Sequence, residues 1–269
     1  MSAFRRTVKF MKRALIVLAL VAGLPAFASA QGRGGPPQPP RPPKDAAPVD
    51  LTGYWVSLVT EDWRWRMVTP LKGDSASIPV NQAAKKITNE WDPAKDEAAG
   101  NQCKAYGAAA IMRMPGRLHI TWVDDNTLKV EADAGTQTRV LHFGGKAPAT
   151  EKPSWQGYSV ARWEAGLTPV GGQLPLGLGP RQSTRSRSLE VVTTNVKAGY
   201  LRKNGVPYSD KATVTEYFER FTEPDGNDHL MVMTVVTDPE YLAVPFVVTS
   251  DFKREADGSK WDPTPCTSR

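Results

Sequence analysis

Tryptophan and arginine alternate in the stretch Trp63-Arg64-Trp65-Arg66-Met67. On a β-strand, successive side chains point to opposite faces, so the apolar residues would share one face and the two arginines the other. Two interpretations follow. The arginines could lie on a solvated face and pair with surface carboxylates, or they could enter a cavity and hold an anionic group through bidentate hydrogen bonds. In the second interpretation, Arg64 and Arg66 bind a ligand.

A histidine, an arginine and a glutamate in expected strands form a second set of candidates. We expect Val123 to pair with Leu128 in the first hairpin. In that register His119 and Arg139 share a face and line an interior, whereas a slip of one residue reverses the arrangement. Both are candidate ligand-binding residues. His119 and Glu216 are the candidate catalytic acid/base residues; the structural alternatives are a solvated histidine and a glutamate in a buried ion pair with an arginine such as Arg139.

A tyrosine lies at each end of the segment YLRKNGVPY, as Tyr200 and Tyr208. Between them are two cations and the turn sequence Asn204-Gly205. Loops carry function more often than strands do, so both tyrosines are candidate ligand-binding residues. The alternative is a purely structural hairpin, because Asn-Gly is a common hairpin turn.

The cysteine count and the motif content narrow the chemistry. Cys103 and Cys266 are the two cysteines of the chain, and in an oxidising compartment they would form a disulfide; the alternative is two separate buried thiols. Two cysteines and three histidines do not readily supply a metal site. The sequence contains no nucleophile elbow, phosphate loop, dinucleotide fingerprint or H-E-x-x-H motif. We therefore expect no metal and no cofactor.

The elements that must position these residues are mainly strands. β-branched and aromatic residues with turn signals between them predict strands at 52–60, 63–69, 117–123, 127–133, 136–143, 157–164, 188–195, 213–221, 230–237 and 246–253. Helices are expected at 82–91, capped by Asn81, and after Pro93 to about residue 106. Strands without repeated βαβ units predict a mainly β fold, either a single antiparallel barrel or a sandwich with one short helical excursion.

The ends and one long loop differ from this body. Residues 1–30 have a basic start, an apolar run and a small-residue site ending at Ala30, which predicts a cleaved signal peptide and a periplasmic or secreted protein. Residues 31–49 are rich in glycine and proline and predict an extended linker before a barrel domain at 50–269. The loop at 165–187 is either a lid or a disordered segment.

Charge excludes one class of partner. The precursor carries a formal charge of +6, but five of its 34 basic residues lie in the predicted signal peptide, and the remaining 29 nearly balance 28 acidic residues. A basic surface for nucleic acid is therefore not expected. No transmembrane segment is expected once the signal peptide is removed.

Several segments resemble a large family of uncharacterised secreted bacterial proteins. These are PSWQGYSVARWE, TEYF and DPEYLAVPF, within about residues 114–252. The resemblance implies a secreted β-rich protein and implies no activity. Gly53-Tyr54-Trp55 more loosely resembles the G-x-W motif of lipocalins. That resemblance implies a tryptophan at the barrel floor with Arg254, after the last strand, packed over it.

Taken together, these residues predict an exported barrel that binds a small apolar or amphipathic ligand, with an anionic group as one option. Tryptophan and methionine would line the pocket, and arginines would anchor the ligand. One alternative is an acid/base lyase, isomerase or hydrolase on the same barrel. Another is an accessory protein of the cell envelope that binds a protein partner.

Overall fold

The computed structural model describes residues 41–60, 62–164 and 188–269. The predicted signal peptide, residues 31–40 of the predicted linker and the whole predicted loop at 165–187 lie outside the described residues. Within the described residues, no helix is both long and apolar enough to cross a membrane.

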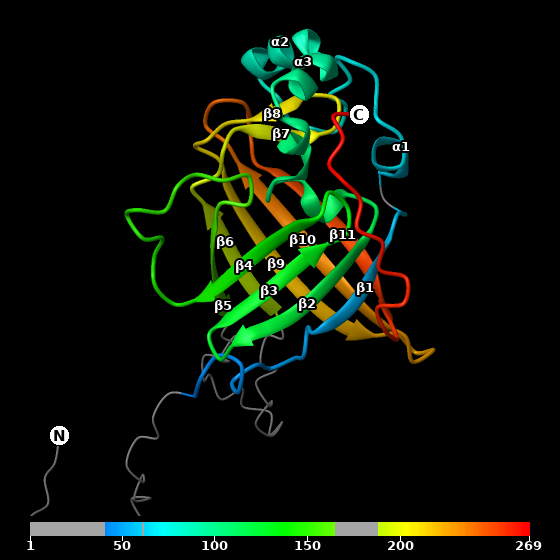
Figure 1. Ribbon diagram of the computed structural model, residues 1–269, viewed down its shortest axis with the longest axis vertical. Helices are drawn as coiled ribbons and strands as arrows, with labels where there is room; N and C mark the ends of the chain where they lie inside the picture. The colour runs from blue at the N-terminus through cyan, green and yellow to red at the C-terminus, as the bar shows by residue number, and fades with distance from the viewer. Residues whose placement is uncertain (1–40, 61, 165–187) are drawn as a thin grey trace, which may run out of the picture. The chain divides into compact units, whose positions relative to one another are not determined.

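Nine strands close into a barrel in the order β1-β11-β10-β9-β6-β5-β4-β3-β2 (Figure 1). Their bounds are β1 Gly53–Leu58, β2 Arg117–Asp124, β3 Thr127–Ala132, β4 Gln137–Phe143, β5 Tyr158–Trp163, β6 Ser188–Thr194, β9 Thr213–Thr222, β10 Asp228–Thr237 and β11 Phe246–Glu255. Neighbouring strands are antiparallel except for β4 and β5, which are parallel. The predicted mainly β barrel is confirmed.

Alternating burial makes these segments strands of a closed sheet. In β10, Leu230, Val232, Thr234 and Val236 are buried and alternate with more exposed residues. The inward-facing side chains of all nine strands fill the barrel. The largest include Trp55, Ile120, Leu141, Phe218 and Phe252, each at most 1% exposed. The centre of the barrel is thus a packed core.

One predicted strand is wrong. Residues 63–69 do not extend; Trp63–Arg66 form the short helix α1 instead. Asp62, immediately before it, has a φ of 54° and turns the chain out of the extended conformation. Helical spacing replaces the predicted two-face alternation, so Arg66 is buried while Trp63 is 63% exposed. A pattern this short cannot distinguish one helical turn from a strand.

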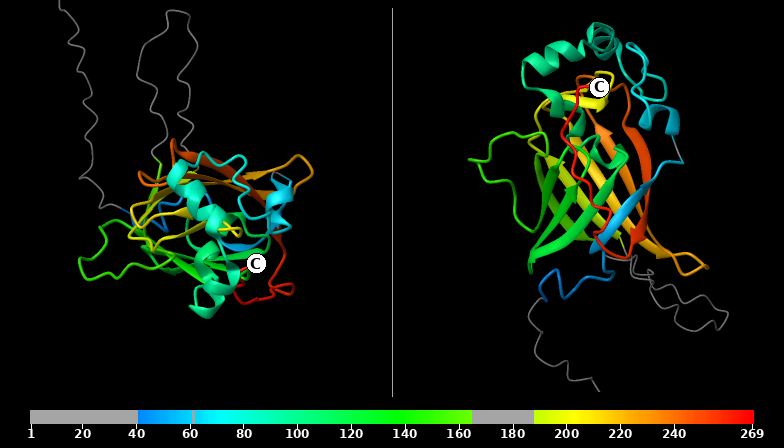
Figure 2. Two further views of the ribbon diagram at one scale, coloured as in Figure 1. Left: turned by 90° about the horizontal axis from the view of Figure 1, so that it is seen from above. Right: turned by 45° about the vertical axis from the view of Figure 1, so that its right-hand side comes forward.

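Helices and a hairpin cap one end of the barrel (Figures 1 and 2). They are α2 Gln82–Glu90, α3 Pro93–Ala98, the 3₁₀ helices η1 Gln102–Tyr106 and η2 Ile111–Arg113, and the hairpin of β7 Gly199–Arg202 with β8 Val206–Tyr208. As predicted, Asn81 caps α2 by accepting a hydrogen bond from the Ala84 N–H, 3.1 Å away. A second apolar cluster, which includes Ile78, Leu201, Val206 and Phe246, joins the cap to the barrel end.

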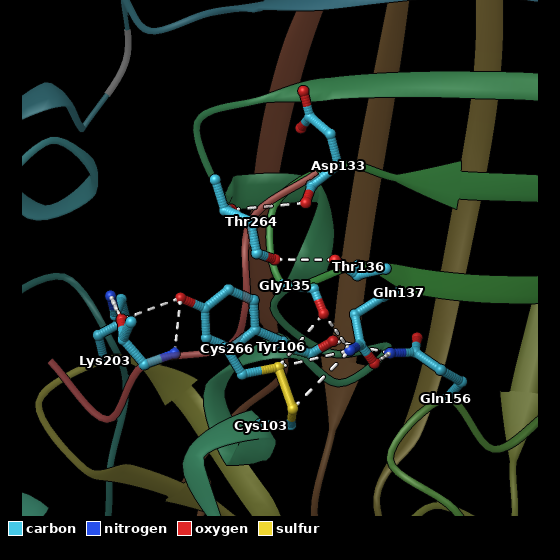
Figure 3. Close-up of a disulfide and its surroundings, with 11 residues drawn as sticks. Cys103, Tyr106, Asp133, Gly135, Thr136, Gln137, Gln156, Lys203, Thr264 and Cys266 are labelled. Atoms are coloured by element: carbon cyan, nitrogen blue, oxygen red, sulfur yellow. Dashed lines mark hydrogen bonds between the residues drawn. A yellow bond between two sulfur atoms is a disulfide. The ribbon is translucent and has the colours of Figure 1, made fainter. Parts of the chain in front are cut away.

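The C-terminal segment runs back along the outside of the barrel to the cap, drawn in red in Figure 1. Cys103 and Cys266 are disulfide-bonded, with an Sγ–Sγ distance of 2.02 Å, and join η1 to this segment. Thr264 donates its N–H to the Asp133 carbonyl at 2.9 Å, close to the disulfide (Figure 3). The two cysteines are thus paired, as one of the two interpretations predicted.

Two contacts fix the other end of the barrel. The Arg254 guanidinium lies 5.5 Å from the centroid of the Trp55 ring, which is the contact that the G-x-W resemblance implied. The part of the predicted linker that the structure describes is not extended. Ala46 donates its N–H to the Pro42 carbonyl in a turn, and the Pro43 carbonyl accepts a hydrogen bond from the indole of Trp163 at 2.8 Å. Trp163 on the barrel thus holds part of the segment that composition alone predicted to be an extended linker.

Candidate functional site

A small hollow lies between the cap and the segment that contains α1. Its volume is about 80 Å³, and α1, η2, β7 and residues 67–69 all contribute to its wall. Four of the described residues that line it are cationic, and no acidic residue is among the lining residues. The cationic residues are Arg66, Arg113, Arg202 and Lys203. We refer to this hollow as the arginine pocket.

Arg113 reaches the pocket from η2 and is only 5% exposed. Its Nη2 donates to the Asp62 carboxylate at 2.8 Å, but its Nε and Nη1 are buried without a hydrogen-bond partner. Burial lowers the pKa of the Arg113 guanidinium, and the nearby Asp62 partly opposes this change. A buried donor without an acceptor is costly, so Arg113 favours the entry of an acceptor into the pocket.

Arg202 lies opposite on β7 and is 2% exposed. Its Nη2 donates to the Ala76 carbonyl at 2.9 Å, while its Nε is buried and has no partner. Burial and the positive charge of Arg113 lower the pKa of Arg202 to about 10. It therefore stays charged at neutral pH, in a setting that disfavours uncompensated positive charge.

Trp65 gathers further positive charge beside the pocket. The guanidinium carbons of Arg64 and Arg202 each lie 4.9 Å from its ring centroid, a distance typical of cation–π contact. The Trp65 indole donates to Asp74 at 3.2 Å. A hydrogen bond from the Ala76 N–H is the main cause that lowers the pKa of Asp74, which keeps this carboxylate ionised. Asp74 thus positions the ring beneath the two cations.

Arg66 fixes the wall of the pocket. Its Nε donates to the Arg113 carbonyl at 2.9 Å, so α1 is joined directly to η2. From the opposite side, the buried Asn204 donates to the carbonyls of Leu71 and Asp74, both at 2.8 Å. The segment between α1 and residue 77 is therefore held at both ends. Arg113 and Arg202 are thus presented by a supported scaffold, which suits binding by pre-organised donors.

We compared the chain with family models, curated proteins and solved structures, and found no match.

Two predicted site residues form a structural pair in the barrel core. The Arg139 Nη1 and Nη2 donate to the two carboxylate oxygens of Glu216 at 2.9 and 2.5 Å, and both side chains are at most 2% exposed. Nη2 also donates to Thr193 Oγ1 at 3.2 Å. Arg139 points into the barrel, as predicted. Its partner is the protein's own glutamate, which matches the ion-pair interpretation of Glu216.

His119 does not share the inward face with Arg139, so that prediction is wrong. The observed register pairs His119 with Glu131 and Leu118 with Ala132. An irregularity between residues 122 and 124 leaves Val123 as an extra residue, which shifts the register by one. His119 therefore stacks on Tyr54 on the outer face of the barrel, with ring centroids 4.0 Å apart. The structure does not bring His119 and Glu216 together.

The predicted tyrosines anchor the cap outside the arginine pocket. Tyr200 donates its hydroxyl to Asp96 at 2.8 Å, and Lys104 donates to the same carboxylate at 2.7 Å. Tyr208 is fully buried, and its hydroxyl has no partner. Burial raises the pKa of both tyrosines. The hairpin between them instead contributes Arg202 and Lys203 to the pocket wall.

Sequence interpretation missed Arg113. It lies in the segment AAAIMRMPG, where a single cation interrupts a run of small and apolar residues. A buried arginine requires partners, so an isolated charge in an apolar run was the available signal. Arg66 was among the predicted ligand-binding residues and does line the pocket, while Arg64 lies beside it on Trp65.

Proposed function

We propose that this protein binds a small molecule through an anionic group, and that the arginine pocket on the capped end of the barrel holds that group. The observation that carries this proposal is the set of buried donors without partners: Arg113 Nε, Arg113 Nη1 and Arg202 Nε. A carboxylate, phosphate or sulfonate supplies several acceptors and a compensating charge. Core side chains fill the centre of the barrel, which supports a site at the cap over the predicted site inside the barrel.

We also propose that the protein functions outside the cytoplasm, as its predicted signal peptide implies. The disulfide between Cys103 and Cys266 supports this proposal, because such bonds persist in oxidising compartments. A ligand pocket in that location would serve a carrier or sensor of small anions. The catalytic alternative has less support, because Glu216 is paired with Arg139 and His119 lies outside the barrel.

Replacing Arg113 with methionine should weaken binding of acetate or methanesulfonate at least tenfold. Charge-assisted hydrogen bonds contribute about 1.5–3 kcal/mol each, and this change removes them together with one positive charge. Titration calorimetry measures the affinity. Arg113→Lys should give an intermediate loss, because lysine keeps the charge but not the planar set of donors.

Arg162→Met is the matched control, because this substitution removes the same charge at a different place. Arg162 is largely exposed on β5 and lies outside the pocket wall. Its anion affinity should remain at the wild-type value. Equal binding by wild type, Arg113→Met and Arg202→Met, with each variant folded by circular dichroism, would contradict the proposal.

Affinity for methanesulfonate should stay constant between pH 6 and 9 and decrease above about pH 10. Methanesulfonate is ionised over this whole pH range. Because the pKa of Arg202 is about 10, its guanidinium loses much of its charge only near pH 10 and above. A pH series of titrations checks this expectation. A histidine in the site would instead make affinity decrease between pH 6 and 8, as imidazolium loses its charge.

A further inference from the structure

Exposed apolar side chains are concentrated next to the arginine pocket. Trp63, Met67, Val68 and Leu71 are all strongly exposed, and Leu71 reaches 83%. The other large exposed apolar residues of the described chain lie on β2, β4, β9, β11 and the loop before β11. Contiguous exposed apolar surface commonly marks a binding site. Met67 and Val68 also line the arginine pocket, so the apolar surface begins at its wall.

A second hollow adjoins the first along the same segment. It has a volume of about 390 Å³. Pro70, Leu71, Trp91 and Pro93 supply its apolar wall, and the polar residues Thr69, Lys72, Asp92 and Arg269 also line it. Thr69 lines both hollows. Trp91 is 7% exposed, and its indole N–H is buried without a partner. A cationic hollow of head-group size therefore adjoins a larger hollow with an apolar wall.

We propose that the ligand is a single-chain amphiphile with an anionic head group. The head binds between Arg113 and Arg202, and the chain passes Val68 and lies along Leu71 in the hollow walled by Trp91. This inference rests on the proposed function and adds the chemical class of the ligand. Charge complementarity orients the head, and the removal of apolar surface from water binds the chain.

The dimensions of the pocket favour one free molecule over a membrane surface. A volume of about 80 Å³ admits a carboxylate, sulfonate or phosphate group but not a two-chain lipid head with its glycerol. Arg113 and Arg202 are at most 5% exposed, so a head group must enter the pocket to reach them. The head group of a lipid in a bilayer would have to leave the membrane surface to reach these two arginines.

The test compares acetate, butyrate, hexanoate and octanoate as monomers by titration calorimetry on the mature protein. Affinity should increase about fourfold for each methylene that enters the hollow. Arg113→Met should weaken every member of the series by the same factor. Leu71→Gln and Val68→Thr should lower the ratio of octanoate to acetate affinity. Val123→Thr is the matched control, because it makes the same change at an exposed position on β2. It should leave the affinities for acetate and octanoate unchanged.

Each result decides between the two proposals. If acetate binds through Arg113 but chain length has no effect, the amphiphile is wrong and the anion site stands. If no acid binds and Arg113→Met changes nothing, both proposals fail. Sedimentation with vesicles of anionic phospholipid, in the absence of binding to monomeric octanoate, would assign the surface to a membrane and overturn the inference. An affinity ratio that Leu71→Gln and Val68→Thr do not alter would also overturn it.

Discussion

Arg139→Met should lower the free energy of unfolding by about 3–5 kcal/mol, because it leaves the Glu216 carboxylate buried without its partner. The pair lies in the barrel core with both side chains at most 2% exposed. The substitution removes both hydrogen bonds from the guanidinium to Glu216, and Thr193 loses the one that it accepts from Arg139. Urea denaturation followed by tryptophan fluorescence measures the change.

The double variant Arg139→Met/Glu216→Leu distinguishes a buried charge from simple loss of packing. Removing both charges should restore most of the stability, since apolar residues of similar volume often replace buried ion pairs without cost. Arg162→Met removes a largely exposed side chain, and Glu190 keeps the hydrogen bond that Tyr217 donates, so stability should change by less than about 1 kcal/mol. A loss of under 1 kcal/mol in Arg139→Met would mean that Glu216 is hydrated or that its charge is compensated elsewhere.

Removing the disulfide through Cys103→Ala and Cys266→Ala should cost about 2–5 kcal/mol. The bond links residues 163 positions apart, so it restricts a long segment of the unfolded chain, and the entropic model places long loops at the upper end of that range. Guanidinium denaturation of the oxidised wild type and the double variant measures the difference.

Dithiothreitol provides the internal control. Reduction should shift the wild type toward the stability of the double alanine variant and leave that variant unchanged. The hydrogen bonds from the Thr264 N–H to the Asp133 carbonyl and from the Thr136 hydroxyl to the Thr264 carbonyl should keep the C-terminal segment on the folded barrel. A double variant as stable as the oxidised wild type would contradict the prediction and show that the covalent link adds no stability beyond these contacts.

Local patterns in the sequence predicted most of the barrel. Segments such as 230–237 and 246–253 are rich in β-branched and aromatic residues, and a closed sheet is the arrangement that buries one face of so many strands. Asn81 is a strong cap for a helix, and Arg139 lies two residues from Leu141, so the two share the inward face of β4. These features depend on interactions within a few residues or on simple alternation, so they can be recognised before the chain is folded.

The candidate site could not be predicted in this way. Arg113 and Arg202 are far apart in the sequence, and they meet only because η2 and the β7–β8 hairpin both pack on the same end of the barrel. The left-handed backbone at Asp62 turned an expected strand into α1 and buried Arg66. One extra residue at Val123 moved His119 to the outer face.

The sequence by itself predicted the segments that form the barrel strands, and it offered a buried ion pair with an arginine such as Arg139 as one alternative for Glu216. It also left a disulfide or two free thiols as the alternatives for the cysteines. The tertiary structure alone decided which charges face one another and which remain without a partner. The physical reason is that strand alternation is a short-range property of the backbone, whereas the environment of a buried guanidinium depends on every element packed around it.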